Sequence, residues 1–199
     1  IEDCVFNTGD DCIAIKSGRN EDGRKWGIPS ENIIVRNCTM ANGHGGVVIG
    51  SEISGGYRGL WVENCKMDSP NLDRVIRIKT STARGGVIEG IHVRNVEVGQ
   101  CREAVLRINL KYEQNEIAKR GFIPEVRDVT LERVTCRKST YGVRFDGLEG
   151  IHASFGVTEL QAGERDMDSA YTRADEALYQ SKRAGKNQIH FSGEEQGDA

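Results

Sequence analysis

A repeat of about thirty residues runs through the first three quarters of the chain, and it restricts the folds that the chain can adopt. Five strand-like segments carry it: CIAIK, GVVIG, VIRIK, VLRIN and GVRFD. Their central apolar residues recur at steps of 34, 29, 30 and 37 residues, at Ile15, Ile49, Ile78, Ile108 and Phe145. Apolar and other residues alternate within the segments, which is typical of strands with one buried face.

A second set of strand segments lies between members of the first: NIIVRNCTM, GLWVENCKM, GIHVRNVEV and DVTLERVTC. Short β-rich units at uneven spacing, with no helical pattern between them, favour a coil of parallel strands. Successive coils would stack about 4.8 Å apart, and loops of unequal length would leave on the outside. An antiparallel sandwich would need hairpin turns, for which Asn42-Gly43 is the one good candidate. We therefore predict a mainly β chain built as a parallel β-helix.

The repeat also explains most of the cysteines. One repeat position holds Cys in three coils and Val in two later ones: Cys4, Cys38, Cys65, Val96 and Val134. A position that accepts either residue is apolar and interior, so we expect stacked free thiols rather than disulfides or a metal site. The preceding position is expected to form a ladder of polar side chains: Asp3, Asn37, Asn64 and Asn95.

Composition excludes several classes of protein. The formal net charge of -3 over 199 residues argues against nucleic-acid binding through bulk charge. No apolar run approaches the roughly 18 residues of a membrane-spanning helix. Basic residues outnumber acidic ones between Arg74 and Lys111, which suits an anionic ligand or a solvated basic face. The first residues already read as a strand, so we expect the chain to start inside a domain, without its export signal.

Polar residues suited to catalysis fall on neighbouring coils. Asp10 and His44 lie one repeat step apart, so the Asp10-Asp11 pair and His44 are expected at the same corner. Arg77 and Lys79 flank an inward-facing isoleucine and should point outward on the next coil. On the coil after that, three residues follow the same line: Arg107, Asn109 and Tyr112.

These residue types fit the cleavage of an acidic polysaccharide. Glycoside hydrolysis needs one carboxylic acid to protonate the leaving oxygen and a second carboxylate to activate water. Asp10 and Asp11 can serve one site only where the strand bends, which Gly9 permits. Arg77 and Lys79 could bind a sugar carboxylate, the arginine in bidentate fashion.

Four ordered motifs are similar to the signatures of glycoside hydrolase family 28, the polygalacturonases and their relatives. They are NTGDDCIAIKSG, GHGGVVIGSE, RIKT and INLKY, at residues 7–18, 43–52, 77–80 and 108–112. The resemblance covers about residues 1–149 and implies a right-handed parallel β-helix that hydrolyses α-1,4-galacturonosyl bonds in pectin with inversion, without metal or cofactor. It also implies a secreted or periplasmic monomer that acts on polygalacturonate, with no nucleic-acid or membrane partner. Residues 18–32 resemble the bacterial members, many of which act on chain ends.

The resemblance also implies roles for individual residues. Asp10 would be the general acid, supported by His44, and Asp11 would be part of the base. Arg77 and Lys79 would hold the galacturonate carboxylate, and Tyr112 would contact the substrate. The family's third aspartate, in an Asn-Thr-Asp motif one coil upstream, has no match here. We therefore expect reduced or no activity, and a non-catalytic pectin-binding β-helix is the alternative.

The pattern changes after Gly150 to strand, helix and strand. The helix is expected from Asp168 to a stop at Gly185, with a short strand at QIHF. The stretch ASFGVTEL…RADEALYQSKRAGKNQI resembles the C-terminal end of GGDEF domains, the diguanylate cyclases, over about residues 151–191.

By that resemblance Lys182 and Lys186 would contact nucleotide phosphates. The alternatives are a fragment of a cyclic di-GMP signalling protein and a packing remnant of a helix and a strand. We expect two domains, residues 1–149 and 150–199, the second with a disordered end. The abrupt change suggests the hypothesis of a chimeric reading frame.

Overall fold

The computed structural model describes residues 1–113, 115, 117–150, 153–158, 164, 167–185 and 188–192. The chain divides into two compact units, Ile1–Asp146 and Gly147–Ala199. None of the helices in the described ranges has the length and apolar content needed to cross a membrane.

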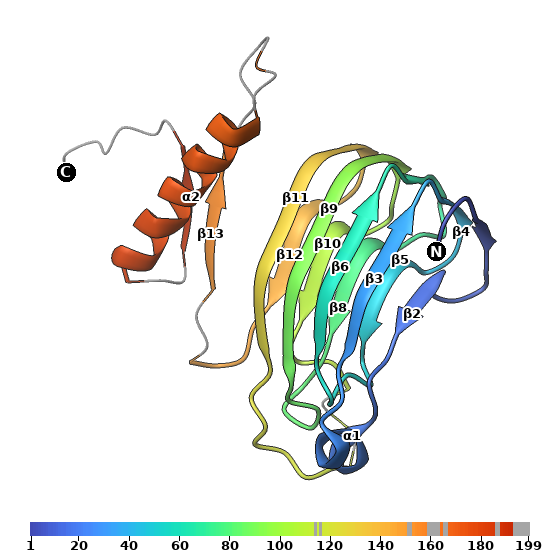
Figure 1. Cartoon of the computed structure of the whole chain (residues 1–199), viewed down its shortest axis with the longest axis vertical. Helices are drawn as coiled ribbons and strands as arrows, with labels where there is room; N and C mark the ends of the chain where they lie inside the picture. Colours follow the sequence, from blue (N-terminus) through green and yellow to red (C-terminus); the bar gives the residue numbers. More distant parts are fainter. Residues whose placement is uncertain are drawn as a thin grey trace. The chain divides into compact units, whose positions relative to one another are not determined.

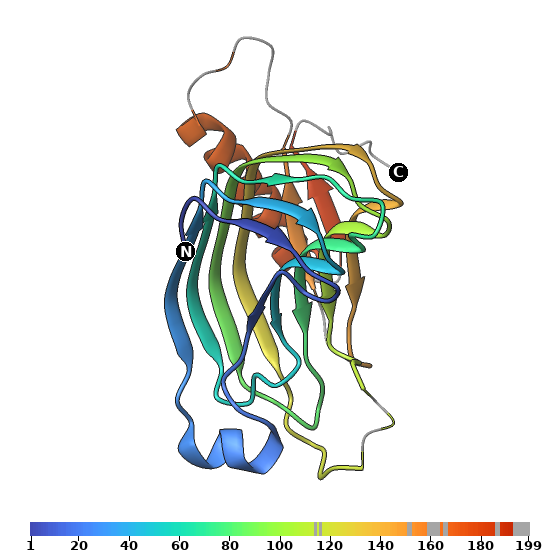
Figure 2. The same ribbon diagram turned by 90° about the vertical axis from the view of Figure 1, so that its right-hand side faces the viewer.

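The first unit is a coil of parallel strands that form two sheets (Figures 1 and 2). One sheet contains β1 (Val5–Asn7), β3 (Ser30–Arg36), β4 (Thr39–Asn42), β6 (Tyr57–Glu63), β7 (Lys66–Met67), β9 (Val87–Gln100) and β11 (Glu125–Lys138). The other runs in the order β12 (Tyr141–Asp146), β10 (Ala104–Asn109), β8 (Arg74–Lys79), β5 (Gly45–Gly50) and β2 (Ile13–Ile15). The five successive coils are therefore β1–β2, β3–β5, β6–β8, β9–β10 and β11–β12.

The strand register in the second sheet follows the sequence repeat. Ile15 pairs with Ile49, Ile49 with Ile78, Ile78 with Ile108, and Ile108 with Phe145. Ile49 and Ile78 are fully buried between the sheets. The predicted parallel β-helix and its alignment are confirmed.

A ladder of left-handed residues marks the corner within the first sheet. Asp3, Asn37, Asn64 and Asn95 have φ values of 55°, 55°, 54° and 53°. Asn tolerates this region better than most residues because its short polar side chain can hydrogen-bond locally. Asn95 Nδ2 donates to Asn64 Oδ1 at 3.1 Å, and Arg133 Nε donates to Asn95 Oδ1 at 2.7 Å. The side-chain ladder predicted from the repeat is present, and Arg133 extends it by one coil.

The cysteines of the repeat are free thiols, as predicted. Cys38 and Cys65 are each 1% exposed, whereas Cys4, on the first coil, is exposed. Burial raises the pKa of the Cys65 thiol, so this side chain behaves as a neutral apolar residue.

One helix interrupts the coil where none was predicted. α1 (Asn20–Trp26) lies in the loop between β2 and β3 (Figure 2). Acidic residues in its first turn and basic residues in its last turn complement the helix dipole. Gly27, at φ 61°, caps its C-terminus through a hydrogen bond to Gly23. The expectation of no helix between the strands was wrong, because this short element is specified by its ends rather than by apolar periodicity.

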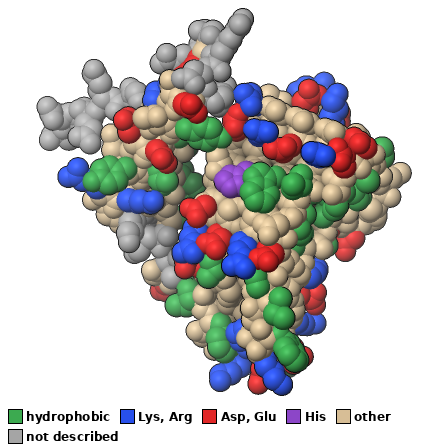
Figure 3. Space-filling view, viewed as in Figure 1, with side chains coloured by type: hydrophobic (Ala, Val, Ile, Leu, Met, Phe, Trp, Pro, Cys, Tyr) green, Lys and Arg blue, Asp and Glu red, His purple; other side chains and the backbone are tan. Residues whose placement is uncertain are grey.

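Opposite charges face each other across the outer surface of the first sheet (Figure 3). Arg94 Nε lies 3.0 Å from a Glu63 carboxylate oxygen, and these two residues are register partners on β9 and β6. Arg127 and Glu89 form the same kind of pair between β11 and β9, at 2.5 Å. Such exposed pairs contribute little to stability because water and salt screen them. They favour the observed register more than they add to stability.

The second unit contains a strand, a helix and a strand, as predicted. β13 (Ser154–Val157) pairs in parallel with β14 (Gln188–Phe191), and α2 (Met167–Arg183) lies between them in sequence. Ala170 and Ala177 are buried apolar residues of the helix. Ser181 Oγ donates a hydrogen bond to the Phe155 carbonyl at 2.8 Å. The chain end that was expected to be disordered lies outside the described residues.

Candidate active site

Asp10 and Asp11 lie in the bend between β1 and β2. Thr8 Oγ1 donates to the Asp10 carbonyl at 2.8 Å, and the Asp11 amide donates to Asp10 Oδ1 at 2.8 Å. These bonds hold the bend and direct the two side chains into different surroundings. The Asp10 side chain is 88% exposed, whereas that of Asp11 is 7% exposed.

Lys79 forms an ion pair with Asp11 across two coils. Its Nζ lies 3.0 Å from Asp11 Oδ2, and its side chain is 10% exposed. The other carboxylate oxygen, Oδ1, accepts no hydrogen bond from the described residues. A Cβ on Gly45 would lie 2.8 Å from that oxygen, so glycine at this position leaves space for the carboxylate.

His44 meets Asp10 at the predicted corner. The His44 amide donates to the Asp10 carbonyl at 3.0 Å, and His44 Nδ1 lies 3.7 Å from Asp10 Oδ1. Gly43, at φ 152°, permits this approach, because a Cβ there would lie 2.9 Å from the Asp10 carbonyl oxygen. Both side chains are exposed, so this end of the site is open to solvent.

Arg77 and Lys79 both pack against Tyr112. The Arg77 guanidinium and the Lys79 ammonium each lie 5.3 Å from the ring centroid. Desolvation by burial, reinforced by the charge of Arg74, lowers the pKa of Arg77. Its Nε makes no hydrogen bond, and no carboxylate of the described residues lies within ion-pair distance. A poorly solvated cation without an acid in ion-pair contact favours an anionic ligand.

Arg107 occupies the register position of Arg77 on the next coil, but its charge is compensated. It pairs with Asp146, and its Nε lies 3.3 Å from a Glu103 carboxylate oxygen. The Arg107 side chain is 6% exposed. The predicted placement of Arg107 at the position of Arg77 is confirmed by the register, but two acids neutralise its charge, which was not predicted.

Two further arginines of the basic cluster are paired with an acid. Arg74 and Arg102 lie 3.0 and 2.6 Å from the Asp73 carboxylate. Asn109, which was expected along the same line, accepts a hydrogen bond from the Lys111 amide at 2.8 Å. Much of the excess of positive charge between Arg74 and Lys111 is therefore neutralised by acids. Arg77 has no acid of the described residues within ion-pair distance.

The structure thus brings all six predicted site residues of the first unit into one chain of contacts. It leads from His44 through Asp10 and Asp11 to Lys79, Tyr112 and Arg77. An exposed carboxylate beside an imidazole and a buried carboxylate beside an ammonium suit acid and base roles. Two residues next to the site, Arg84 and Glu113, were not predicted from the sequence. Both lie in loops outside the strand repeat, so the repeat gave no indication of their role.

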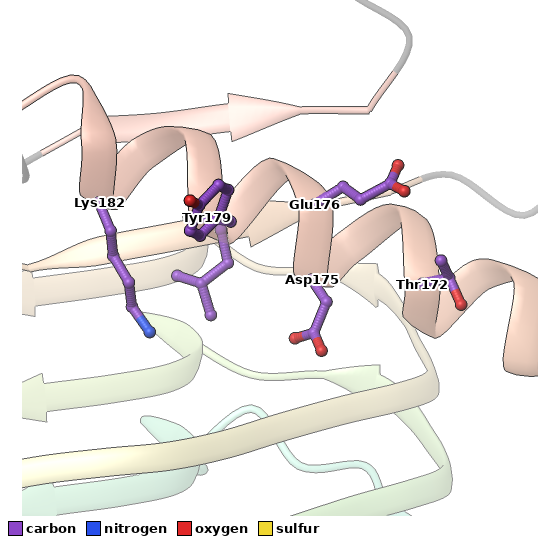
Figure 4. Close-up of a pocket in the computed structure, with 6 residues that line it drawn as sticks. Thr172, Asp175, Glu176, Tyr179 and Lys182 are labelled. Atoms are coloured by element: carbon purple, nitrogen blue, oxygen red, sulfur yellow. The ribbon is translucent and has the colours of Figure 1, made fainter.

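The phosphate-contacting lysines expected in the second unit are only partly described. Lys182 lies on α2 beside a shallow hollow, together with Thr172, Asp175, Glu176, Leu178 and Tyr179 (Figure 4). Two of these neighbours are acidic, which does not favour a phosphate. Lys186 lies outside the described residues.

Comparison with known proteins assigns the chain to a family. Residues 1–161 match the family described as Glycosyl hydrolases family 28, and the chain belongs to that family. It is 31% identical over 170 residues to a "Probable polygalacturonase" of Vitis vinifera, which covers 81% of this chain and 34% of that protein. It is 30% identical over 167 residues to an "Exo-poly-alpha-D-galacturonosidase" of Dickeya chrysanthemi, covering 79% of this chain and 27% of that protein.

A solved structure shows the same architecture. The exopolygalacturonase of Thermotoga maritima matches with a TM-score of 0.70 and 40% sequence identity, over 80% of this chain and 34% of that one. The first unit is therefore a right-handed parallel β-helix of a glycosidase family. The chain spans about a third of the length of these relatives.

Proposed function

We propose that the site hydrolyses α-1,4-galacturonosyl bonds in polygalacturonate by an inverting acid/base mechanism. The observation that carries this proposal is the pairing of exposed Asp10 with His44 and of buried Asp11 with Lys79, 3.0 Å away. The names of the relatives from grapevine, Dickeya and Thermotoga all indicate action on galacturonate polymers, which supports this substrate class.

The two carboxylates would divide the chemistry. Asp10 is exposed beside His44 and donates the proton to the leaving glycosidic oxygen. Asp11, held by Lys79 at 3.0 Å, acts as the base that receives a proton from the attacking water. Arg77 binds the carboxylate of the uronic acid, and the Tyr112 ring packs against the sugar and the cations. Inversion of the configuration at the anomeric carbon is proposed from the resemblance to the family.

Release of reducing ends from polygalacturonate tests the proposal. Asp10→Asn and Asp11→Asn should each reduce the rate at least about a hundredfold, the usual contribution of a general acid or base. The matched control is Asp22→Asn in α1, which should leave the rate unchanged. Binding of polygalacturonate without any Asp10-dependent release would favour the non-catalytic β-helix instead. The reduced rate expected from the unmatched third aspartate stays a prediction for the same assay.

The size of the reaction products shows whether the chain cleaves polygalacturonate at its ends or in its interior. The names of the Dickeya and Thermotoga relatives indicate action on chain ends, and we propose the same for this chain. Small products alone, from the first minutes of reaction, would support this mode, whereas a ladder of intermediate oligomers would contradict it. The secreted or periplasmic location and the monomeric state stay predictions.

The GGDEF resemblance of the tail, its domain boundary and the chimeric origin also stay predictions. Binding of GTP to the chain, lost on Lys182→Gln, would support the nucleotide role. Sequencing the same junction independently from a second genome would contradict the chimera.

A further inference from the structure

Beside the proposed site, Arg84 links three successive coils. Its side chain is 1% exposed, and its Nη2 lies 2.6 Å from Glu113 Oε2. Its Nε donates to the Ser51 carbonyl at 3.2 Å, and Ser51 Oγ donates to the same Glu113 oxygen at 3.2 Å. Nη1 contacts Asn20 Oδ1 in α1. Burying a guanidinium is costly unless its donors are satisfied, so these contacts form one cooperative cluster.

The backbone of Glu113 adopts a conformation that is unfavourable for a residue with a Cβ atom. Its φ is 52°, in the left-handed region that glycine adopts without cost. Arg120 Nη2 donates to the Glu113 carbonyl at 3.1 Å, which holds the same turn from the other side. Because backbone freedom alone would favour glycine here, the contacts of the carboxylate explain a glutamate at this position.

The residue before this turn is Tyr112. Its amide donates to the Thr80 carbonyl at 3.0 Å, which fixes the tyrosine to the segment that follows Lys79. Its ring then lies 5.3 Å from both the Arg77 guanidinium and the Lys79 ammonium. The Tyr112 backbone is thus held by Thr80 on one side and by Glu113 on the other.

We propose that Glu113, held by Arg84 and Ser51, is a positioning residue that fixes the Tyr112 ring over Arg77 and Lys79. The ring sets the orientation of Arg77, which would receive the uronic acid, and of Lys79, which holds Asp11, so Glu113 determines how tightly the acidic sugar binds. This inference rests on the proposed function only for the nature of the ligand. The placement of Tyr112 can be measured without catalysis.

Two substitutions separate positioning from stability. Glu113→Gly relieves the left-handed backbone but leaves the buried Arg84 guanidinium without the Glu113 carboxylate, so its melting temperature should fall. Glu113→Gln retains the side-chain size and removes the charge. Both should raise KM for polygalacturonate about tenfold and change kcat less than about threefold, since the acid and base are untouched. The control is Glu125→Gln. It removes an exposed ion pair with Arg127 on β11, which makes no contact with the site residues named above.

A spectroscopic readout reports on Tyr112 directly. The protein is labelled with 3-fluorotyrosine, and the Tyr112 signal in the ¹⁹F spectrum is assigned from Tyr112→Phe. In both Glu113 variants this signal should move toward that of an exposed tyrosine, while it stays in place in the control. An unchanged signal and an unchanged KM would overturn the inference, whatever happens to the melting temperature. If the wild type shows no Asp10-dependent hydrolysis, the proposed function fails, but the fluorine signal still decides whether Glu113 positions the ring.

Discussion

Replacing Lys79 with methionine removes the ammonium group beside Asp11 while keeping a long, flexible side chain. The two side chains are 10% and 7% exposed and their charged atoms lie 3.0 Å apart, so water reaches neither group well. Removal of one member of a buried ion pair costs about 3–5 kcal/mol, because the remaining charge has no partner. We expect Lys79→Met to lower the free energy of unfolding by that amount.

The same substitution at an exposed pair provides the control. Lys66 Nζ lies 3.6 Å from a Glu97 oxygen, but these side chains are 70% and 72% exposed. Lys66→Met should therefore cost no more than about 1 kcal/mol. The double variant Asp11→Asn/Lys79→Met carries no buried charge at this place and should recover most of the loss.

Urea denaturation followed by tryptophan fluorescence measures these differences, since Trp26 and Trp61 both lie in the first unit. The denaturation midpoint of Lys79→Met should fall well below those of the wild type, the control and the double variant. Equal midpoints for Lys79→Met and Lys66→Met would refute the buried pair. Failure of the double variant to recover would show that the loss comes from packing rather than from the unpaired carboxylate.

Three further predictions concern groups around the same core. Gly45→Ala would place a Cβ 2.8 Å from Asp11 Oδ1 and should reduce hydrolysis at least about tenfold, whereas Gly142→Ala, with no atom within 4 Å, should not; equal rates would contradict the crowding. Burial, with a smaller contribution from the neighbouring thiol, raises the pKa of Cys101 from 9.0 to about 12, so only the unfolded state loses this proton as the pH rises above 9. Stability should therefore fall between pH 9 and 12, by up to about 1.4 kcal/mol per pH unit from this group, and Cys101→Ala should flatten the slope measured by urea denaturation. Cys4 is exposed and should react with a thiol reagent at pH 8 much faster than Cys101; similar rates for the two would contradict their burial.

The sequence repeat predicted the strand register because each coil places equivalent residues directly above one another. The intervals between Ile15, Ile49 and Ile78 absorb loops of different length, and the structure pairs these residues as aligned. The same alignment placed Asp10 beside His44, since both follow from one repeat step. The residues that stack on neighbouring coils can therefore be predicted from the sequence wherever the repeat is regular.

Pairing between side chains was harder to predict. Arg77 and Arg107 occupy the same register position, yet Arg107 forms ion pairs with Asp146 and Glu103, while no acid of the described residues lies within ion-pair distance of Arg77. The acids that decide this difference lie outside the repeat position itself. Charge compensation depends on side-chain directions in loops and at strand ends, which the period of the strands does not specify.

The helix α1 and the Arg84–Glu113 pair were missed for a related reason. Both lie in the loops that leave the coil, where the repeat is interrupted. Glu113 could have been suspected only from its backbone conformation, which the sequence does not reveal. The repeat thus predicted which strand residues lie together, and the structure was needed for the loop residues that contact them.

A crystal structure of the Asp10→Asn variant with trigalacturonate tests the central claim most directly. We expect a sugar carboxylate within hydrogen-bonding distance of the Arg77 guanidinium, a glycosidic oxygen next to residue 10, and the Tyr112 ring against the bound sugar. Trigalacturonate bound elsewhere on the β-helix, with Arg77 and Asp11 untouched, would contradict the assignment of these residues to pectin cleavage.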